Sequence, residues 1–275
     1  MAGALLDALA ESQFRMVYQP VFTTEGEIVA FEALLRWHHP AWGPVSPPDF
    51  IPTAEKSGLI VPIGDWVIDE VCRQGLEWNA AHLCPIKMFA NVSGVQLERP
   101  DFSAKIASAL DRSGLAPDRL ELEITESWVI SDLRGAAGKL QQLRNLGIGV
   151  ALDDFGTGYA AFDYLQELPL DTLKIDRSFV QRLDRPDANP STVRAMTILG
   201  RQLGLTTVAE GVESEEQVRR LGEIGCDLMQ GFLLGRPLTP EAARALLRDQ
   251  KRPAPLLQVA AKKASPVAST ECRIG

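Results

Sequence analysis

Two adjacent aspartates, Asp153 and Asp154, stand at the end of the short apolar run 148–152 and just before the glycine-rich segment 155–159. The apolar run has the composition of a buried strand, and the glycine-rich segment is typical of a loop. Two ionised carboxylates at the end of a buried strand repel each other and lose hydration, which is costly unless a cation lies between them. The stretch therefore favours a divalent metal site over a phosphate-binding loop, since two carboxylates repel an anion. An aspartate helix cap followed by a flexible turn is the alternative for this stretch alone.

Polar side chains stand at the ends of most other predicted strands as well. In chain order they are Glu32 and Arg36, Asn91, Glu123 and Glu126, Asp153 and Asp154, Lys174 and Asp176, Glu210 and Glu213, and Gln230. If the strands form a barrel, these ends share one rim, where barrel enzymes place their active sites. So many acids at one rim cannot all stay ionised without divalent cations. Oxygen ligands without Cys or His indicate Mg²⁺ or Mn²⁺, and the number of acids favours two ions.

The elements that must position these residues alternate between strand and helix. Strands are expected at 14–22, 27–37, 86–92, 120–125, 148–153, 170–175, 206–209 and 227–230. Helices are expected at 5–12, 62–81, 102–113, 133–146, 191–203, 215–223 and 240–249, and a further helical segment begins at residue 47. Only four residues separate the first two strands, so they must pair antiparallel as a hairpin. The pattern predicts an α/β fold, a TIM-type (β/α)8 barrel modified by one antiparallel strand. An open doubly wound sheet is the alternative, but no glycine fingerprint follows its first strand.

Composition narrows the classes of function. The chain has 275 residues, 45% of them hydrophobic and 23% charged, as in ordinary soluble globular proteins. A net charge of −8 provides no basic surface for duplex nucleic acid. Four cysteines without paired spacing are expected to be reduced thiols in the cytoplasm, and neither a membrane span nor a signal peptide is expected. We expect one domain over residues 1–250 and a disordered tail over residues 251–275, which are rich in Pro, Ala, Lys and Ser.

The sequence Phe-Glu-Ala-Leu-Leu-Arg-Trp at 31–37 resembles the signature of the EAL-domain phosphodiesterases. The resemblance covers residues 14–247, and further motifs follow in the family's order: Tyr-Gln-Pro at 18–20, Asn-Val-Ser at 91–93, Glu-Ile-Thr-Glu at 123–126, Asp-Asp-Phe-Gly-Thr-Gly-Tyr at 153–159, Lys-Ile-Asp at 174–176, Glu-Gly-Val-Glu at 210–213 and Gln-Gly-Phe at 230–232. The resemblance implies a modified TIM-type barrel with one antiparallel strand. It also implies hydrolysis of cyclic di-GMP to linear pGpG with two Mg²⁺ or Mn²⁺ ions. Ca²⁺ is expected to inhibit, because it tolerates looser geometry and acidifies water less.

The resemblance further implies a role for each strand-end residue. One metal would be held by Glu32, Asn91, Glu123 and Asp153, and the other by Asp153, Asp154 and Glu210. Catalysis would fall to Lys174, Glu32, Glu210 and Asp176, with Lys174 either orienting or deprotonating the attacking water. Substrate binding would fall to Arg36, Gln19, Gln230, Asp154 and Glu213, with Arg36 on a phosphate. The loop beside the metals would be supported by Glu126, Gly156, Thr157 and Gly158.

The chain departs from the family in one loop. The family usually continues Tyr-Ser-Ser-Leu, whereas this chain has Tyr159, Ala160, Ala161 and Phe162, so two hydroxyls are missing from a loop that links dimerisation to metal binding in the family. Phe232, beside Gln230, is a candidate for either guanine contact or core packing. Every metal-ligand position carries the expected residue, which favours an active hydrolase, expected as a homodimer. The alternatives are a catalytically silent cyclic di-GMP receptor acting through protein partners and a hydrolase of another phosphodiester.

Overall fold

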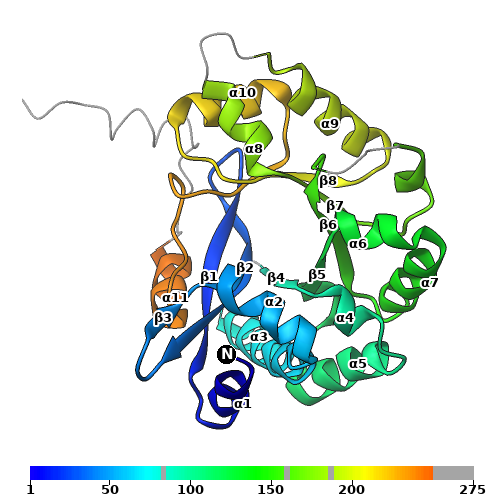
Figure 1. The fold of residues 1–275 in the computed structure, drawn as a ribbon. Coiled ribbons are helices and arrows are strands. Elements are labelled where there is room, and N and C mark those ends of the chain that lie inside the picture. Colours follow the sequence, from blue (N-terminus) through cyan, green and yellow to red (C-terminus); the bar gives the residue numbers. More distant parts are fainter. Residues whose placement is uncertain (82–84, 158–161, 185–188, 250–275) are drawn as a thin grey trace, which may run out of the picture.

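The protein is represented by a computed structural model that describes residues 1–81, 85–157, 162–184 and 189–249. Its strands close into a barrel with helices around the outside (Figure 1). The strands are β1 (Phe14–Thr23), β2 (Ile28–His39), β3 (Gly43–Val45), β4 (Lys87–Asn91), β5 (Leu120–Thr125), β6 (Gly149–Phe155), β7 (Thr172–Ile175), β8 (Thr206–Ala209) and β9 (Leu228–Met229). The order β1-β9-β8-β7-β6-β5-β4-β2, closed by β1–β2 pairing, confirms the predicted modified barrel.

The helices lie between successive strands, as expected from the alternating pattern. They are α1 (Ala2–Ala10), α2 (Pro47–Ser57), α3 (Ile60–Ala81), α4 (Gly94–Leu97), α5 (Phe102–Ser113), α6 (Glu126–Ser131), α7 (Leu133–Arg144), α8 (Arg177–Val180), α9 (Ser191–Gln202), α10 (Glu215–Ile224) and α11 (Pro240–Asp249), with 3-10 turns at Pro117–Arg119, Phe162–Gln166 and Gln181–Asp184. The predicted boundaries of α5, α11, β5 and β8 agree with the structure. Strand β3 and the short helices α4, α6 and α8 were not expected from the sequence.

The first two strands form the predicted antiparallel hairpin. In β1 and β2, Gln19 pairs with Glu32, and β1 is also antiparallel to β9, whereas the pairs from β2–β4 through β8–β9 are parallel. One strand therefore runs against the barrel direction. Strand β3 pairs antiparallel with the far end of β2 and lies outside the barrel (Figure 1).

The barrel interior below the rim contains a cluster of apolar side chains together with the buried Glu121, which is in register with Phe89. Val21, Ala30, Phe89 and Val208 form a small buried cluster there, while the outward-facing strand residues pack against the helices in the main core. Because side chains alternate along a strand, an inward-facing apolar residue is followed two positions later by an inward-facing residue at the rim. Phe89 is followed in this way by Asn91, so the packed interior forms the floor beneath the polar rim.

Candidate active site

Lys174 lies at the centre of a group of carboxylates contributed by widely separated strands. Its Nζ is 2.5 Å from Glu123 Oε1, 2.6 Å from Glu210 Oε1, 3.3 Å from Asp153 Oδ1 and 3.9 Å from Glu32 Oε2. Lys174 and Glu123 are each only 1% exposed. The structure thus brings the predicted acids of four different strand ends around one buried ammonium group.

The two aspartates reach the same site because strand β6 contains a bulge. Leu152 pairs with Leu173 and Phe155 pairs with Ile175, so two residues of β6 oppose a single residue of β7. Asp154 also has a left-handed backbone conformation, with φ 57°. Adjacent residues of a regular strand point to opposite faces, and a bulge re-aims one of them. As a result, carboxylate oxygens of Asp153, Asp154 and Glu210 lie within 4.8 Å of one another.

Two carboxamides hold the Glu32 carboxylate. Asn91 Nδ2 donates a hydrogen bond to Glu32 Oε1 at 2.8 Å, and Gln230 Nε2 donates to Glu32 Oε2 at 2.7 Å. Burial acts to raise the pKa of Glu32, but Lys174 and these hydrogen bonds outweigh it and keep the pKa below its ordinary value. Gln19, which faces Glu32 across the hairpin, donates from Nε2 to the Gly235 carbonyl at 3.0 Å.

The cluster carries more buried negative charge than Lys174 can neutralise. Burial and then the neighbouring Glu32 raise the pKa of Glu123 well above its ordinary value, and burial raises the pKa of Glu210 to about 8. For Lys174, burial opposes the charged form, but Asp153 and the other carboxylates outweigh it and raise its pKa. Oε1 of Glu123 and Oδ1 of Asp153 are fully buried and face Lys174 Nζ, whereas Oε2 of Glu123 is fully buried and lacks a hydrogen-bond partner among the described residues. Such acids fit divalent cations, whose charge would compensate theirs.

Glu126 holds the beginning of the loop that follows the two aspartates. Its Oε2 accepts a hydrogen bond from the Gly156 N–H at 3.1 Å, and its Oε1 accepts one from Tyr164 Oη at 2.6 Å. Gly156 has φ 96°, and a Cβ at this position would lie 2.4 Å from Met196 Cε, so glycine is required. Thr157 Oγ1 donates to the Asp154 carbonyl at 2.8 Å. Gly158, predicted to belong to this loop, lies outside the described residues, as does the predicted tail 251–275.

Two cavities flank the cluster and share Glu32 as a lining residue. The larger has a volume of about 380 Å³ and is bordered by Arg36 and Asn91. The smaller has a volume of about 200 Å³ and is lined by Gln19, Glu32, Arg177, Glu210, Gly211, Glu213, Gln230, Gly231 and Phe232. Carboxylates of the cluster line both cavities, Glu32 in each and Glu210 in the smaller one.

The remaining predicted residues lie around this mouth. Arg36 is partly buried, which lowers the pKa of its guanidinium, and its Nη1 donates to the Leu35 carbonyl at 2.9 Å. Asp176 accepts from the Ser178 N–H at 3.0 Å, capping α8, and its charge helps to raise the pKa of Asp154 after burial and Asp153. Phe232 is 50% exposed beneath the Arg236 guanidinium, so core packing was the wrong alternative for it.

Sequence reasoning missed two residues that shape the site. Tyr164 contacts Glu126 from 38 positions away, and no local pattern indicates that pairing. Gln96 lines the larger cavity and closes a capping box with Ser93. The spacing Ser-x-x-Gln after Asn91 is a readable signal for a helix start, which would have placed Gln96 near the rim.

Comparisons with known proteins show close relatives. A model of the EAL domain matches residues 2–237. Over 238 residues the chain is 43% identical to the bifunctional diguanylate cyclase/cyclic di-GMP phosphodiesterase MucR of Pseudomonas aeruginosa, covering 86% of this chain and 35% of MucR. Over 249 residues it is 37% identical to the cyclic di-GMP phosphodiesterase NbdA of the same organism, covering 90% of this chain and 32% of NbdA. The chain thus spans about a third of the length of these curated relatives.

A solved structure, "PaMucR Phosphodiesterase, c-di-GMP complex", superimposes with a TM-score of 0.84 at 42% identity, covering 88% of this chain and 98% of that chain. Within the described part of the chain, no helix has both the length and the apolar character needed to cross a membrane.

Proposed function

The chain belongs to the EAL domain family, and from this membership and its complete site we propose that it is a phosphodiesterase that hydrolyses cyclic di-GMP to linear pGpG with two divalent cations. The observation that carries the proposal is the convergence of Glu32, Glu123, Asp153 and Glu210 on Lys174 at the barrel rim. Relatives named as cyclic di-GMP phosphodiesterases support the choice of substrate.

The acids divide into two groups that fit two cations. Glu32, Asn91, Glu123 and Asp153 would hold one Mg²⁺ or Mn²⁺, and Asp153, Asp154 and Glu210 the other. The support is the proximity of carboxylate oxygens of Asp153, Asp154 and Glu210, and the buried Oε2 of Glu123, which lacks a hydrogen-bond partner among the described residues. Bound cations supply Lewis acidity, which polarises a phosphate ester and acidifies water.

Lys174 acts in this proposal as a hydrogen-bond donor that positions the attacking water. Its short contacts to Glu123 and Glu210 are those of a charged ammonium, which has three N–H donors and no acceptor. An ammonium held between carboxylates can place one donor toward a water or phosphoryl oxygen at the cluster without losing its own support. We therefore favour orientation of the water over its deprotonation by Lys174.

The two cavities account for the two halves of a cyclic dinucleotide. Arg36 borders the larger cavity, and its planar guanidinium suits two oxygens of one phosphate. Gln19, Gln230 and Glu213 line the smaller cavity and would contact the other half. A substrate that spans both cavities places a phosphodiester over the shared Glu32, next to the carboxylates.

The proposal is tested by measuring product formation by the wild type and by two variants that each change one buried glutamate of the same strand. The purified protein is incubated with cyclic di-GMP and Mg²⁺ or Mn²⁺, and the nucleotides are separated by chromatography; pGpG is expected. Glu123→Gln should lower turnover by about 100-fold or more, since it removes a charge from the site. Glu121→Gln should leave turnover in place, because Glu121 is a buried acid on the same strand that pairs with Lys87, away from the rim.

Absence of pGpG with both metals would contradict the proposal. Binding of cyclic di-GMP without hydrolysis would favour the receptor alternative, which the intact set of acids disfavours. Homodimerisation, carried over from the family, is also a proposal, and light scattering of the purified chain tests it.

A further inference from the structure

The larger cavity holds polar groups that neither metal nor phosphate binding accounts for. Its walls are mostly apolar, with Ile51, Ile60, Ile63 and Val67 among them. Beyond Arg36 and the rim residues, Glu55 of α2 and Gln96 of α4 also line it. A few polar groups placed in an apolar cavity are the usual means by which a binding site selects one ligand.

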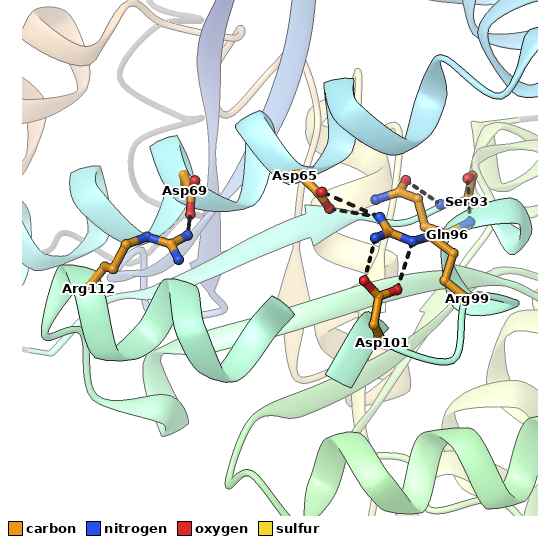
Figure 2. A network of polar contacts seen from close by, with 7 residues as sticks. All are labelled: Asp65, Asp69, Ser93, Gln96, Arg99, Asp101 and Arg112. Atoms are coloured by element: carbon orange, nitrogen blue, oxygen red, sulfur yellow. Dashed lines mark hydrogen bonds and ion pairs between the residues drawn. The ribbon is translucent and has the colours of Figure 1, made fainter. Parts of the chain in front are cut away.

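Gln96 presents a fixed donor at this wall. It is 3% exposed, its Oε1 accepts from the Ser93 N–H at 3.2 Å, and Ser93 Oγ accepts from the Gln96 N–H at 3.3 Å. Its Nε2 has no hydrogen-bond partner among the described residues. Figure 2 shows the side chain reaching from α4 toward α3, where a Cβ on Gly64 would lie 2.0 Å from Nε2. The capping box therefore occupies the amide oxygen Oε1 and leaves the Nε2 donor available to a ligand.

Glu55 presents a free acceptor. The carboxylate is partly buried and makes no hydrogen bond or ion pair with another described residue. Asp65, the nearby acid on α3, is instead paired with Arg99 Nη1 at 3.3 Å, and Arg99 also binds Asp101 at 2.7 Å (Figure 2). This clamp fixes α3 against the turn before α5. Glu55 is thus a lining carboxylate without a hydrogen-bonding or charged partner among the described residues, and it would repel a phosphate-bearing ligand unless the ligand donates hydrogen bonds to it.

We propose that Glu55 and Gln96 are specificity-determining residues that select guanine in the larger cavity, an inference that rests on the proposed function. Guanine offers the N1–H and N2–H₂ donors that a carboxylate accepts in pairs, and the O6 and N7 acceptors that an amide N–H₂ can reach. Adenine places an unprotonated N1 where guanine has a donor, so its lone pair would face the Glu55 carboxylate. The aliphatic walls cover the faces of the base.

The test compares two ligands across three variants. Dissociation constants for cyclic di-GMP and for cyclic di-IMP, which lacks the N2 amino group, are measured by calorimetry for the wild type, Glu55→Gln, Gln96→Glu and the control Asp49→Asn, an exposed acid on the same helix. Gln96→Glu keeps the capping-box acceptor but replaces the donor by an oxygen. Melting curves of all four proteins check folding.

Each substitution has its own expected pattern. The wild type should bind cyclic di-GMP about tenfold or more tightly than cyclic di-IMP, and Glu55→Gln should lose most of this preference. Gln96→Glu should raise the dissociation constants of both ligands by about tenfold or more and leave the ratio of the two constants unchanged, since both bases carry O6 and N7. Asp49→Asn should match the wild type.

A preference for cyclic di-GMP that survives Glu55→Gln, or Gln96→Glu binding that equals the wild type, overturns the proposal. If the wild type binds cyclic di-GMP but does not hydrolyse it, only the phosphodiesterase proposal is overturned. The ratios of the dissociation constants for cyclic di-GMP and cyclic di-IMP then still decide the roles of Glu55 and Gln96. Failure of the wild type to bind either ligand overturns both.

Discussion

Replacing Lys174 by Met should destabilise the metal-free protein and make its stability depend on divalent cations. The ammonium contacts Glu123 at 2.5 Å and Glu210 at 2.6 Å, with Asp153 and Glu32 somewhat farther away, and it is 1% exposed. Removing one partner of a buried ionic group costs about 3–5 kcal/mol, because the opposite charges are left uncompensated. At about 2–4 °C per kcal/mol for a domain of this size, the melting temperature should fall by about 6–20 °C.

The assay is thermal unfolding in EDTA and in Mg²⁺, with Lys139→Met as the matched control. Lys139 contacts Glu98 at 2.5 Å on the surface, where such a pair contributes about 0–1 kcal/mol. Mg²⁺ should raise the melting temperature of Lys174→Met more than that of the wild type, since the cation replaces the missing positive charge. If Lys174→Met and Lys139→Met melt within about 2 °C of each other in EDTA, the reasoning on the buried cluster is refuted.

Three further changes test separate parts of the structure. Gly231→Ala places a Cβ 2.1 Å from the Val212 carbonyl oxygen, so it should lower the free energy of unfolding, measured with denaturant, by about 3 kcal/mol. The control Gly222→Ala, with open space around it in α10, should leave the stability unchanged or raise it. Equal stabilities of the two variants would contradict the packing argument. Glu126→Gln presents an amide donor to the Tyr164 hydroxyl or to the loop N–H, so it should lower the free energy of unfolding by about 1–3 kcal/mol. It should also weaken Mg²⁺ affinity in a titration. If stability and Mg²⁺ affinity are both unchanged, Glu126 does not support the loop. EDTA should abolish turnover, Mg²⁺ should restore it and Ca²⁺ should not, because Ca²⁺ accepts looser geometry; full activity in Ca²⁺ would count against the two-cation scheme.

The barrel was predictable because its evidence lies in local pattern. The four-residue gap between the first two strands forced the hairpin, and glycines and apolar runs marked most later elements. Strand β3 spans only Gly43–Val45, and helices α4, α6 and α8 have four to six residues, too short for a periodicity to develop. Elements of this length are decided by tertiary contacts and caps.

The convergence of the candidate site residues at one rim was predictable from the sequence, but their detailed geometry was not. The rule that parallel strands end at one rim brought Glu32, Glu123 and Lys174 together in advance. Regular alternation would have sent Asp153 and Asp154 to opposite faces, and the bulge that unites them depends on pairing with β7, which only the assembled barrel supplies.

Anomalous diffraction at the manganese edge, from crystals grown with Mn²⁺, would show directly whether the rim holds two cations. Two peaks are expected at the rim, one beside Glu32, Asn91 and Glu123 and the other beside Asp154 and Glu210, with Asp153 between them. Density for manganese elsewhere, or none at the rim, would contradict the account that these side chains converge to hold paired cations.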